Sequence, residues 1–270
     1  MLGLGTFGVA WSIGVLKYPL PVRPMSYKDV LQFAHDLGLK LVQFGDNLPL
    51  DALSEDDLHN LLDKAERMGI SLEVGTRGIS EANLNKNIEI AALCKSSILR
   101  VVVDSANDHP SPDEVIVRVR PHLEAMKKAN VILAIENHDR FPVAELVHIL
   151  KSLNSPFVGI CLDTVNSFGS LEGPNVVIEA LAPYVVNLHV KEFLIKRADH
   201  NMGFTITGAP TGQGMLDLPN LLEKLDKHGR QYNAIIETWL PPQTTMEETA
   251  QLEQLWVQES VTYLRTMIKD

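Results

Sequence analysis

The sequence has few of the features that mark secreted or membrane proteins. Only two of its 270 residues are cysteines, Cys94 and Cys161, so there is no disulfide framework to read. No uninterrupted apolar stretch reaches about 18 residues, the length that a membrane-spanning helix requires. The opening residues, MLGLGTFGVA, lack the charged start of a signal peptide. We therefore expect a cytoplasmic protein with no membrane partner.

An excess of basic residues is also absent. Lysine and arginine total 24 against 34 aspartates and glutamates, which gives a formal net charge of −10 and a pI near 5.4. This balance argues against nucleic acid as the main partner. The apolar fraction of 45% is ordinary for a globular protein. The oligomeric state is left open, a homo-oligomer included.

Strand-like apolar segments alternate with helical patterns along the whole chain. The expected strands are 2–9, 39–45, 70–76, 98–104, 131–136, 157–163, 185–190 and 234–238. The expected helices are 26–38, 54–69, 81–96, 112–129, 142–153, 173–182, 217–229 and 246–268. Several strands are almost continuously apolar, as parallel strands covered on both faces are. Eight βα units of about 34 residues predict a single-domain α/β protein, a (β/α)8 TIM barrel over 1–270. A doubly wound open sheet is the alternative.

Four polar residues end four consecutive apolar strands in the C-terminal half. They are Glu136, Asp163, His189 and Glu237, separated by 27, 26 and 48 positions. The first two intervals are each about one βα repeat, and the third is one repeat plus a long loop, so all four side chains reach one end of a barrel. Three carboxylates and one imidazole favour a single divalent ion, Mn²⁺ or Mg²⁺ first, then Co²⁺ or Zn²⁺. In the alternative, the glutamates pair with basic loop residues and His189 is an ordinary buried histidine.

Five segments around these positions resemble the xylose isomerase-like TIM barrels, also called the sugar phosphate isomerase/epimerase superfamily. They are IENHDRF (135–141), CLDTVNSFG (161–169), NLHVKEF (187–193), GAPTGQGMLDL (208–218) and IIETWLPP (235–242). The resemblance covers nearly the whole chain. It implies that the Glu-Asp-His-Glu set binds one divalent metal. It also implies that Glu136 and Glu237 stand on opposite sides of the substrate carbon and exchange protons with it.

The chain departs from the sugar epimerases of that family at three places. Pro142 stands where they often carry a further glutamate, and Asn166 stands where they often carry a histidine. Their arginine soon after the ligand histidine is replaced by Lys191 or Arg197. The resemblance therefore supports the metal site more strongly than it supports the specificity of a ketose epimerase.

Two residues close to the ligands are expected to take part in catalysis. Lys191 lies two positions after His189, on the same side of an extended strand, where it can bind a carboxylate, phosphate or hydroxyl of the substrate. In the alternative it forms a salt bridge to Glu136 or Glu192. His138 is a candidate for a second proton-transfer group, or else it only supports the structure.

Four further residues are expected to bind the substrate. They are Asn166, Arg77, Arg197 and His200. Arg77 follows the third strand and can hold a carboxylate, unless it pairs with Glu73 or Asp104. Arg197 and His200 lie in the long connection 191–216, a cationic segment of an acidic chain. We predict that this connection is a mobile lid whose cations bind an anionic group.

Together these expectations describe proton transfer at a carbon next to a carbonyl group. The metal would hold the carbonyl oxygen, one of the two glutamates would remove the proton, and the other would return it. We expect a metal-dependent isomerase or epimerase that acts on a small sugar or sugar acid. The alternative is a metal-dependent lyase, a decarboxylase or dehydratase, that acts on a 3-oxo sugar acid. The intact ligand set argues against a sugar-binding barrel without catalysis, and phosphodiester cleavage would need more metal ligands and a basic surface.

Overall fold

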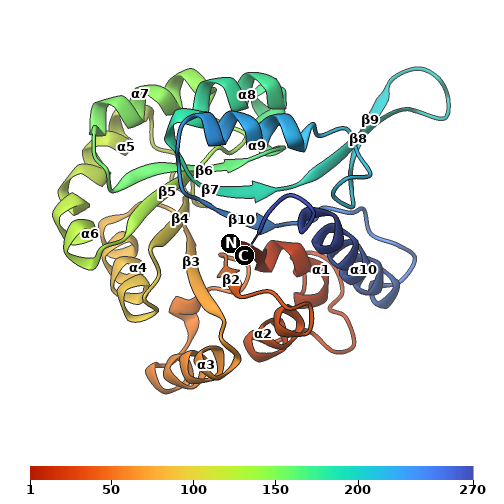
Figure 1. Ribbon diagram of the computed structural model, residues 1–270, viewed down its shortest axis with the longest axis horizontal. Coiled ribbons are helices and arrows are strands. Elements are labelled where there is room, and N and C mark those ends of the chain that lie inside the picture. Colours follow the sequence, from red (N-terminus) through yellow and green to blue (C-terminus); the bar gives the residue numbers. More distant parts are fainter. Residues whose placement is uncertain (270) are drawn as a thin grey trace.

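Eight parallel strands close into a barrel in the computed structural model, which describes residues 1–269 (Figure 1). Neighbouring strands follow the order β1-β10-β7-β6-β5-β4-β3-β2, and β2 pairs with β1 to complete the ring. The strands are β1 Leu2–Gly5, β2 Leu41–Phe44, β3 Ser71–Arg77, β4 Ile98–Val102, β5 Ile132–Glu136, β6 Val158–Asp163, β7 Val185–Val190 and β10 Asn233–Ile236. The predicted TIM barrel is confirmed, and the open sheet is excluded.

The helices surround this barrel, and several begin at a short polar side chain that caps the first turn. Ser111 and Thr245 form capping boxes with the glutamates three residues later. The helices are α1 Ala10–Ile13, α2 Tyr27–Asp36, α3 Glu55–Met68, α4 Glu81–Leu93, α5 Pro112–Val119, α6 Leu123–Ala129, α7 Val143–Leu153, α8 Pro174–Leu181, α9 Leu218–Lys227 and α10 Met246–Leu264. The predicted helix 112–129 is divided by a 3-10 turn at Arg120–His122, where a proline removes an N–H donor. Within residues 1–269, no helix is long and apolar enough to cross a membrane.

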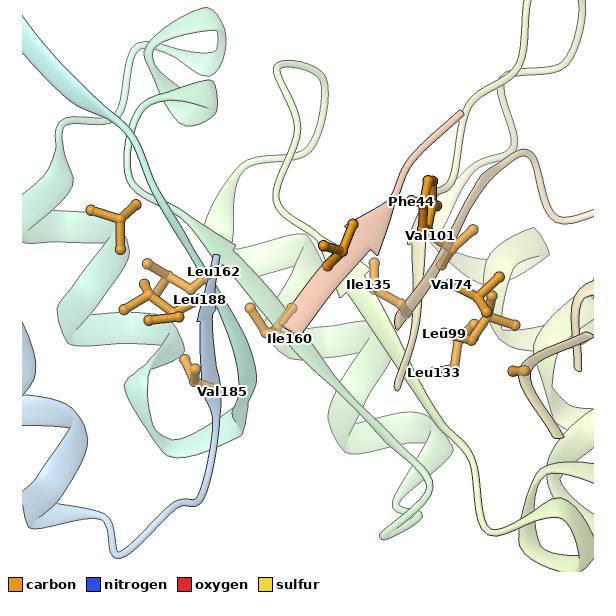
Figure 2. Close-up of a cluster of buried hydrophobic side chains, with 14 of the residues drawn as sticks. Phe44, Val74, Leu99, Val101, Leu133, Ile135, Ile160, Leu162, Val185 and Leu188 are labelled. Atoms are coloured by element: carbon orange, nitrogen blue, oxygen red, sulfur yellow. The ribbon is translucent and has the colours of Figure 1, made fainter. Parts of the chain in front are cut away.

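The main hydrophobic core lies between the barrel and its helices. Figure 2 shows part of it, with the labelled side chains Phe44, Val74, Leu99, Val101, Leu133, Ile135, Ile160, Leu162, Val185 and Leu188. Burial of each such side chain stabilises the fold by about 1.5–3 kcal/mol. Strand positions between these residues face the barrel interior, because side chains alternate along a strand. The interior contains polar groups, since Gln43, Glu73 and Asn187 are hydrogen-bonded to one another there.

The connection 191–216 contains a structured hairpin that the sequence analysis did not predict. Strands β8 Glu192–Arg197 and β9 Phe204–Ala209 pair antiparallel over six residue pairs. Figure 1 shows the hairpin projecting away from the barrel. These strands pair with each other and not with the barrel, so they lack the continuous apolar run that identified the buried strands. The expectation of a loop over 191–216 was therefore wrong for these two strands.

Candidate metal centre

The four predicted ligands lie together at the carboxyl end of the barrel. Glu136 and Asp163 end β5 and β6, His189 lies near the end of β7, and Glu237 directly follows β10. All four are at most 3% exposed. The Nδ1 atom of His189 lies 3.2 Å from Glu237 Oε1, 3.5 Å from Glu136 Oε2 and 3.8 Å from Asp163 Oδ2. Parallel pairing brings these strand ends side by side, with Asp163 opposite His189 in the β6–β7 register.

Buried polar atoms at this point fit a divalent cation. Among residues 1–269, His189 Nδ1 is buried without a hydrogen-bond partner, and the buried Asp163 Oδ2 and Glu237 Oε2 each lie 2.8 Å from the Lys191 ammonium. Such groups are costly to bury unless a cation or a donor reaches them. One atom each from Asp163, His189 and Glu237 can be chosen so that all lie within 4.8 Å of one another. This set of oxygen and imidazole nitrogen donors suits Mg²⁺ or Mn²⁺, and Zn²⁺ or Co²⁺ as well.

A glycine in the first strand leaves room for one of these carboxylates. A Cβ atom on Gly5 would lie 3.1 Å from Glu237 Cγ and 2.9 Å from Ile235 Cγ2. Both contacts are tighter than ordinary van der Waals distance, so a side chain at this position would displace Glu237. The absence of a side chain in β1 therefore contributes to the placement of the fourth ligand.

Cys161 lies beside the ligands, and one atom each from Glu136, Cys161 and His189 also lie within 4.8 Å of one another. Its thiol is buried and lies 3.4 Å from Asn187 Oδ1, to which it donates a hydrogen bond. Burial raises the pKa of the thiol well above its ordinary value, and the charge of Glu136 adds to the effect. A metal is bound by the thiolate form, which this environment disfavours.

Lys191 reaches into the centre from the end of β7. Its Nζ lies 2.8 Å from Asp163 Oδ2 and 2.8 Å from Glu237 Oε2, and 3.5 Å from Asn166 Oδ1. Burial lowers the pKa of Lys191, but Asp163 and Glu237 outweigh burial and raise it above its ordinary value. The salt bridge to Glu136 or Glu192 that was considered as an alternative does not form, because the ammonium instead neutralises two candidate ligands.

Glu136 is held on both of its carboxylate oxygens. Arg100 donates from Nε to Glu136 Oε2, and Asn166 Nδ2 donates to Glu136 Oε1 at 2.7 Å. Burial raises the pKa of Glu136, but Arg100 and His189 outweigh it and hold the pKa at about 2. Asn166, which was predicted to bind substrate, thus contacts a candidate ligand directly.

Arg100 is a site residue that the sequence analysis missed. It lies on β4, is 3% exposed and also donates from Nη1 to Asp46 Oδ1 at 2.9 Å. Burial raises the pKa of Asp46, but Arg100 and Arg77 outweigh it and lower the pKa below its ordinary value. An arginine alone in the apolar run ILRVVVD was the available signal, since an unpaired charge is rarely buried in a barrel strand.

The other predicted residues lie at varying distances from the ligands. Arg77 donates to Asp46 Oδ2 at 2.7 Å, so it reaches the centre only through Asp46 and Arg100. The Nδ1 atom of His138 contacts the carboxylate of its neighbour Asp139. Its side chain is 32% exposed, and that of Asp139 is 65% exposed.

Arg197 and His200 lie at the far end of the hairpin. The Arg197 guanidinium stacks on Phe204, 4.6 Å from the ring centroid, and donates to the carbonyl oxygen of Asn201 at 3.1 Å. His200 Nδ1 accepts from the backbone N–H of Met202 at 3.1 Å. Both residues are exposed. The structure does not bring them to the four ligands.

A pocket of about 290 Å³ lies next to the ligands. It is lined by Val165, Asn166, Phe168, Lys191, Ile206 and Trp239. The hairpin contributes Ile206 to this pocket, and Lys191 is its one charged residue. A larger cavity of about 690 Å³ opens at the opposite end of the barrel, where the strands begin, and contains none of the predicted site residues. The smaller pocket is therefore the candidate substrate site.

Known proteins resemble this chain over most of its length. A family model of xylose isomerase-like TIM barrels matches residues 31–260. The chain is 33% identical over 265 residues to a 3-oxo-isoapionate decarboxylase of Pectobacterium atrosepticum, and the match covers 98% of this chain and 95% of the relative.

Solved structures of lower identity share the fold. A D-psicose 3-epimerase with D-tagatose from Clostridium cellulolyticum H10 is 15% identical, with a TM-score of 0.73 over 99% of both chains. A xylose isomerase-like TIM barrel protein from Mycobacterium smegmatis in complex with magnesium is also 15% identical, with a TM-score of 0.66 over 97% of both chains. From the family model, the decarboxylase relative and the closed barrel, we conclude that the chain belongs to the xylose isomerase-like TIM barrel family.

Proposed function

We propose that this chain is a metal-dependent lyase that removes CO₂ from a 3-oxo acid derived from a sugar. The relative that is 33% identical along almost the whole chain is a decarboxylase of a 3-oxo acid. The departures at Pro142 and Asn166 from the pattern of the sugar epimerases point the same way. We place the lyase before the isomerase or epimerase that the sequence analysis preferred.

One observation supports the lyase over the isomerase or epimerase. Both oxygens of Glu136 accept hydrogen bonds, one from Arg100 and one from Asn166. An epimerase needs two free bases on opposite faces of one carbon, because one removes the proton and the other returns it. A carboxylate held by a buried guanidinium and an amide is a poor base. Decarboxylation needs no base to remove a proton from carbon, so it tolerates a Glu136 that serves only to bind a metal.

The residues of the pocket supply the remaining requirements. When bound by Glu136, Asp163, His189 and Glu237, a divalent ion would polarise the 3-oxo group and make it an electron acceptor. Lys191, the one cation that lines the pocket, is placed to pair with the substrate carboxylate. Binding of a cation by Asp163 and Glu237 would release the Lys191 ammonium for that role.

The proposed reaction follows from these positions. The bond between the carboxylate carbon and its neighbouring carbon breaks, its electron pair moves toward the 3-oxo group, and CO₂ leaves. The neighbouring carbon then takes one proton, which the Lys191 ammonium in the pocket wall would donate, and Lys191 recovers a proton from water. Phe168, Ile206 and Trp239 make the pocket largely apolar, which limits the access of water to the intermediate.

Isotope incorporation tests the proposal. Protein loaded with Mn²⁺ is incubated in deuterated water with 3-oxo sugar acids and, separately, with neutral keto-sugars. We expect CO₂ release from the acids and one deuterium at the carbon that lost the carboxylate. Lys191→Met should lower kcat by about 10²–10⁴-fold, the usual contribution of a general acid, with the metal still bound. Absence of CO₂ release from every acid would overturn the assignment.

The isomerase or epimerase remains the second candidate. The structural likeness to D-psicose 3-epimerase and the presence of two glutamates, Glu136 and Glu237, at 3.5 and 3.2 Å from His189 Nδ1 favour it. In the same experiment this activity would place deuterium in recovered keto-sugar without loss of CO₂.

A further inference from the structure

A network of buried amide side chains lies beneath the candidate ligands, inside the barrel. Gln43 Oε1 lies 2.7 Å from His189 Nε2, and the His189 ring is fully buried. The other ring nitrogen, Nδ1, has no hydrogen bond and faces the three ligand carboxylates. A neutral imidazole carries one N–H, so a hydrogen bond to a carbonyl oxygen at Nε2 leaves the lone pair on Nδ1.

The direction of this hydrogen bond depends on which way the Gln43 amide is turned. Gln43 Nε2 lies 2.9 Å from Glu73 Oε2 and 3.1 Å from Asn187 Oδ1. Both of these atoms are acceptors. A reversed amide would place the Gln43 oxygen against the carboxylate oxygen of Glu73 and lose both hydrogen bonds in a buried setting, which costs more than the one bond it could form.

Glu73 is in turn fixed by amide donors. Asn187 Nδ2 donates to Glu73 Oε2 at 2.9 Å, and Asn233 Nδ2 donates to Glu73 Oε1 at 2.6 Å. Glu73 is 2% exposed and Asn187 is fully buried, so neither has water as an alternative partner. Together, Glu73, Asn187 and Asn233 leave one orientation for Gln43.

We propose that Gln43, oriented by Glu73, is a positioning residue that holds the proton of His189 on Nε2 and presents Nδ1 to a divalent ion. Neither Gln43 nor Glu73 takes part directly in the proposed decarboxylation. The inference deepens the proposed function, on which its consequence for metal binding rests. The proton on Nε2 is a property of the chain without metal, whether or not the carboxylates around Nδ1 also protonate that nitrogen, and it can be measured independently. Residues that orient a metal-binding histidine typically change metal affinity by about 10–100-fold when removed.

The test compares Gln43→Met, which keeps the volume and removes the amide, with Asn87→Leu as a matched control. Asn87 is also a buried amide, but it lies in α4 and bonds Asn83. Protein labelled with ¹⁵N-histidine is examined by NMR without metal, with the His189 signals assigned through His189→Asn. Mn²⁺ affinity is then measured by calorimetry, and thermal unfolding confirms that each variant is folded.

We expect His189 in wild type and Asn87→Leu to carry a proton on Nε2 that exchanges slowly with water, because Gln43 Oε1 accepts it. Gln43→Met should lose this slow exchange and bind Mn²⁺ about 10–100-fold more weakly. Should Gln43→Met not fold, Glu73→Met provides the same test, because it removes the acceptor that orients Gln43. A wild-type His189 without a proton on Nε2, or an unchanged exchange rate and metal affinity in the variant, would overturn the inference. A wild type with the expected Nε2 proton but no affinity for divalent ions would overturn the proposed metal dependence and leave the assignment of that proton intact.

Discussion

Arg100 is a buried guanidinium whose position is explained by two carboxylates. It pairs with Glu136 on the next strand and with Asp46 in the loop after β2, and the exposed fraction of its side chain is 3%. Taking such a charge out of water is expensive unless partners satisfy it on more than one side. Arg100 thereby links the half of the barrel that carries the four candidate ligands to the first strands.

Removal of Arg100 should therefore destabilise the protein strongly. Arg100→Leu leaves the buried Glu136 and the partly buried Asp46 without their main partner, and we expect a loss of about 3–5 kcal/mol in the free energy of unfolding. Arg77→Leu is the matched control, because Arg77 also pairs with Asp46 but its side chain is 35% exposed, and it should cost under about 1 kcal/mol. Urea unfolding in the presence of a chelator measures both. Equal losses in the two variants would contradict the role assigned to Arg100.

The ligand set and the residues that support it differ in how far the sequence reveals them. A Glu, Asp, His, Glu series at successive strand ends is visible because each residue interrupts an apolar run. Gln43 and Glu73 also interrupt strands. Each lies within its strand and not at its end, so neither matches the pattern of polar residues at strand ends. Their partners Asn187 and Asn233 are more than a hundred positions away, and only the closed barrel brings them together.

At the scale of elements, the eight βα units were predictable from alternating patterns, whereas the β8–β9 hairpin was not. The first barrel strand is shorter than the expected 2–9, because β1 ends at Gly5 and a 3-10 turn follows at Thr6–Val9. The hairpin carries polar and apolar residues on both of its strands, and its pairing is local. The search for continuous apolar runs, which finds strands buried under helices, therefore could not identify this hairpin.

The hairpin should act on the substrate through Ile206 more than through its cations. Arg197→Ala and His200→Ala remove exposed groups far from the ligands, so kcat/KM should stay within about twofold of wild type. Ile206→Ala removes a wall of the pocket beside Lys191 and should lower kcat/KM about tenfold, the scale of a lost apolar contact in a substrate site. Steady-state kinetics on the substrate found by CO₂ release checks this. A larger loss in Arg197→Ala than in Ile206→Ala would restore the anion-binding role first expected of the loop.

At the scale of the whole molecule, the centre joins β5, β6, β7 and the segment after β10, a continuous half of the barrel ring. Three buried carboxylates and one histidine meet there, and without a bound metal the Lys191 ammonium is the cation closest to Asp163 and Glu237. A metal bound at this centre would therefore link metal binding to folding, because a ligand that binds only the folded chain stabilises it. At a concentration about 100 times the Kd, the gain is about 2.7 kcal/mol.

This linkage predicts an unusual effect of Lys191→Met on thermal unfolding. Without metal, the variant should unfold at a lower temperature than wild type, because Asp163 and Glu237 lose the ammonium that offsets their charge. With Mn²⁺ bound, the same carboxylates are satisfied by the ion, so the variant and wild type should unfold at similar temperatures. The rise in unfolding temperature on adding Mn²⁺ should thus be larger in Lys191→Met than in wild type, and absent in His189→Ala. Lys196→Met, which removes an exposed lysine of the hairpin, serves as the control and should show the wild-type rise. If Lys191→Met and Lys196→Met gave the same rise, the Lys191 ammonium and the metal would not share these carboxylates.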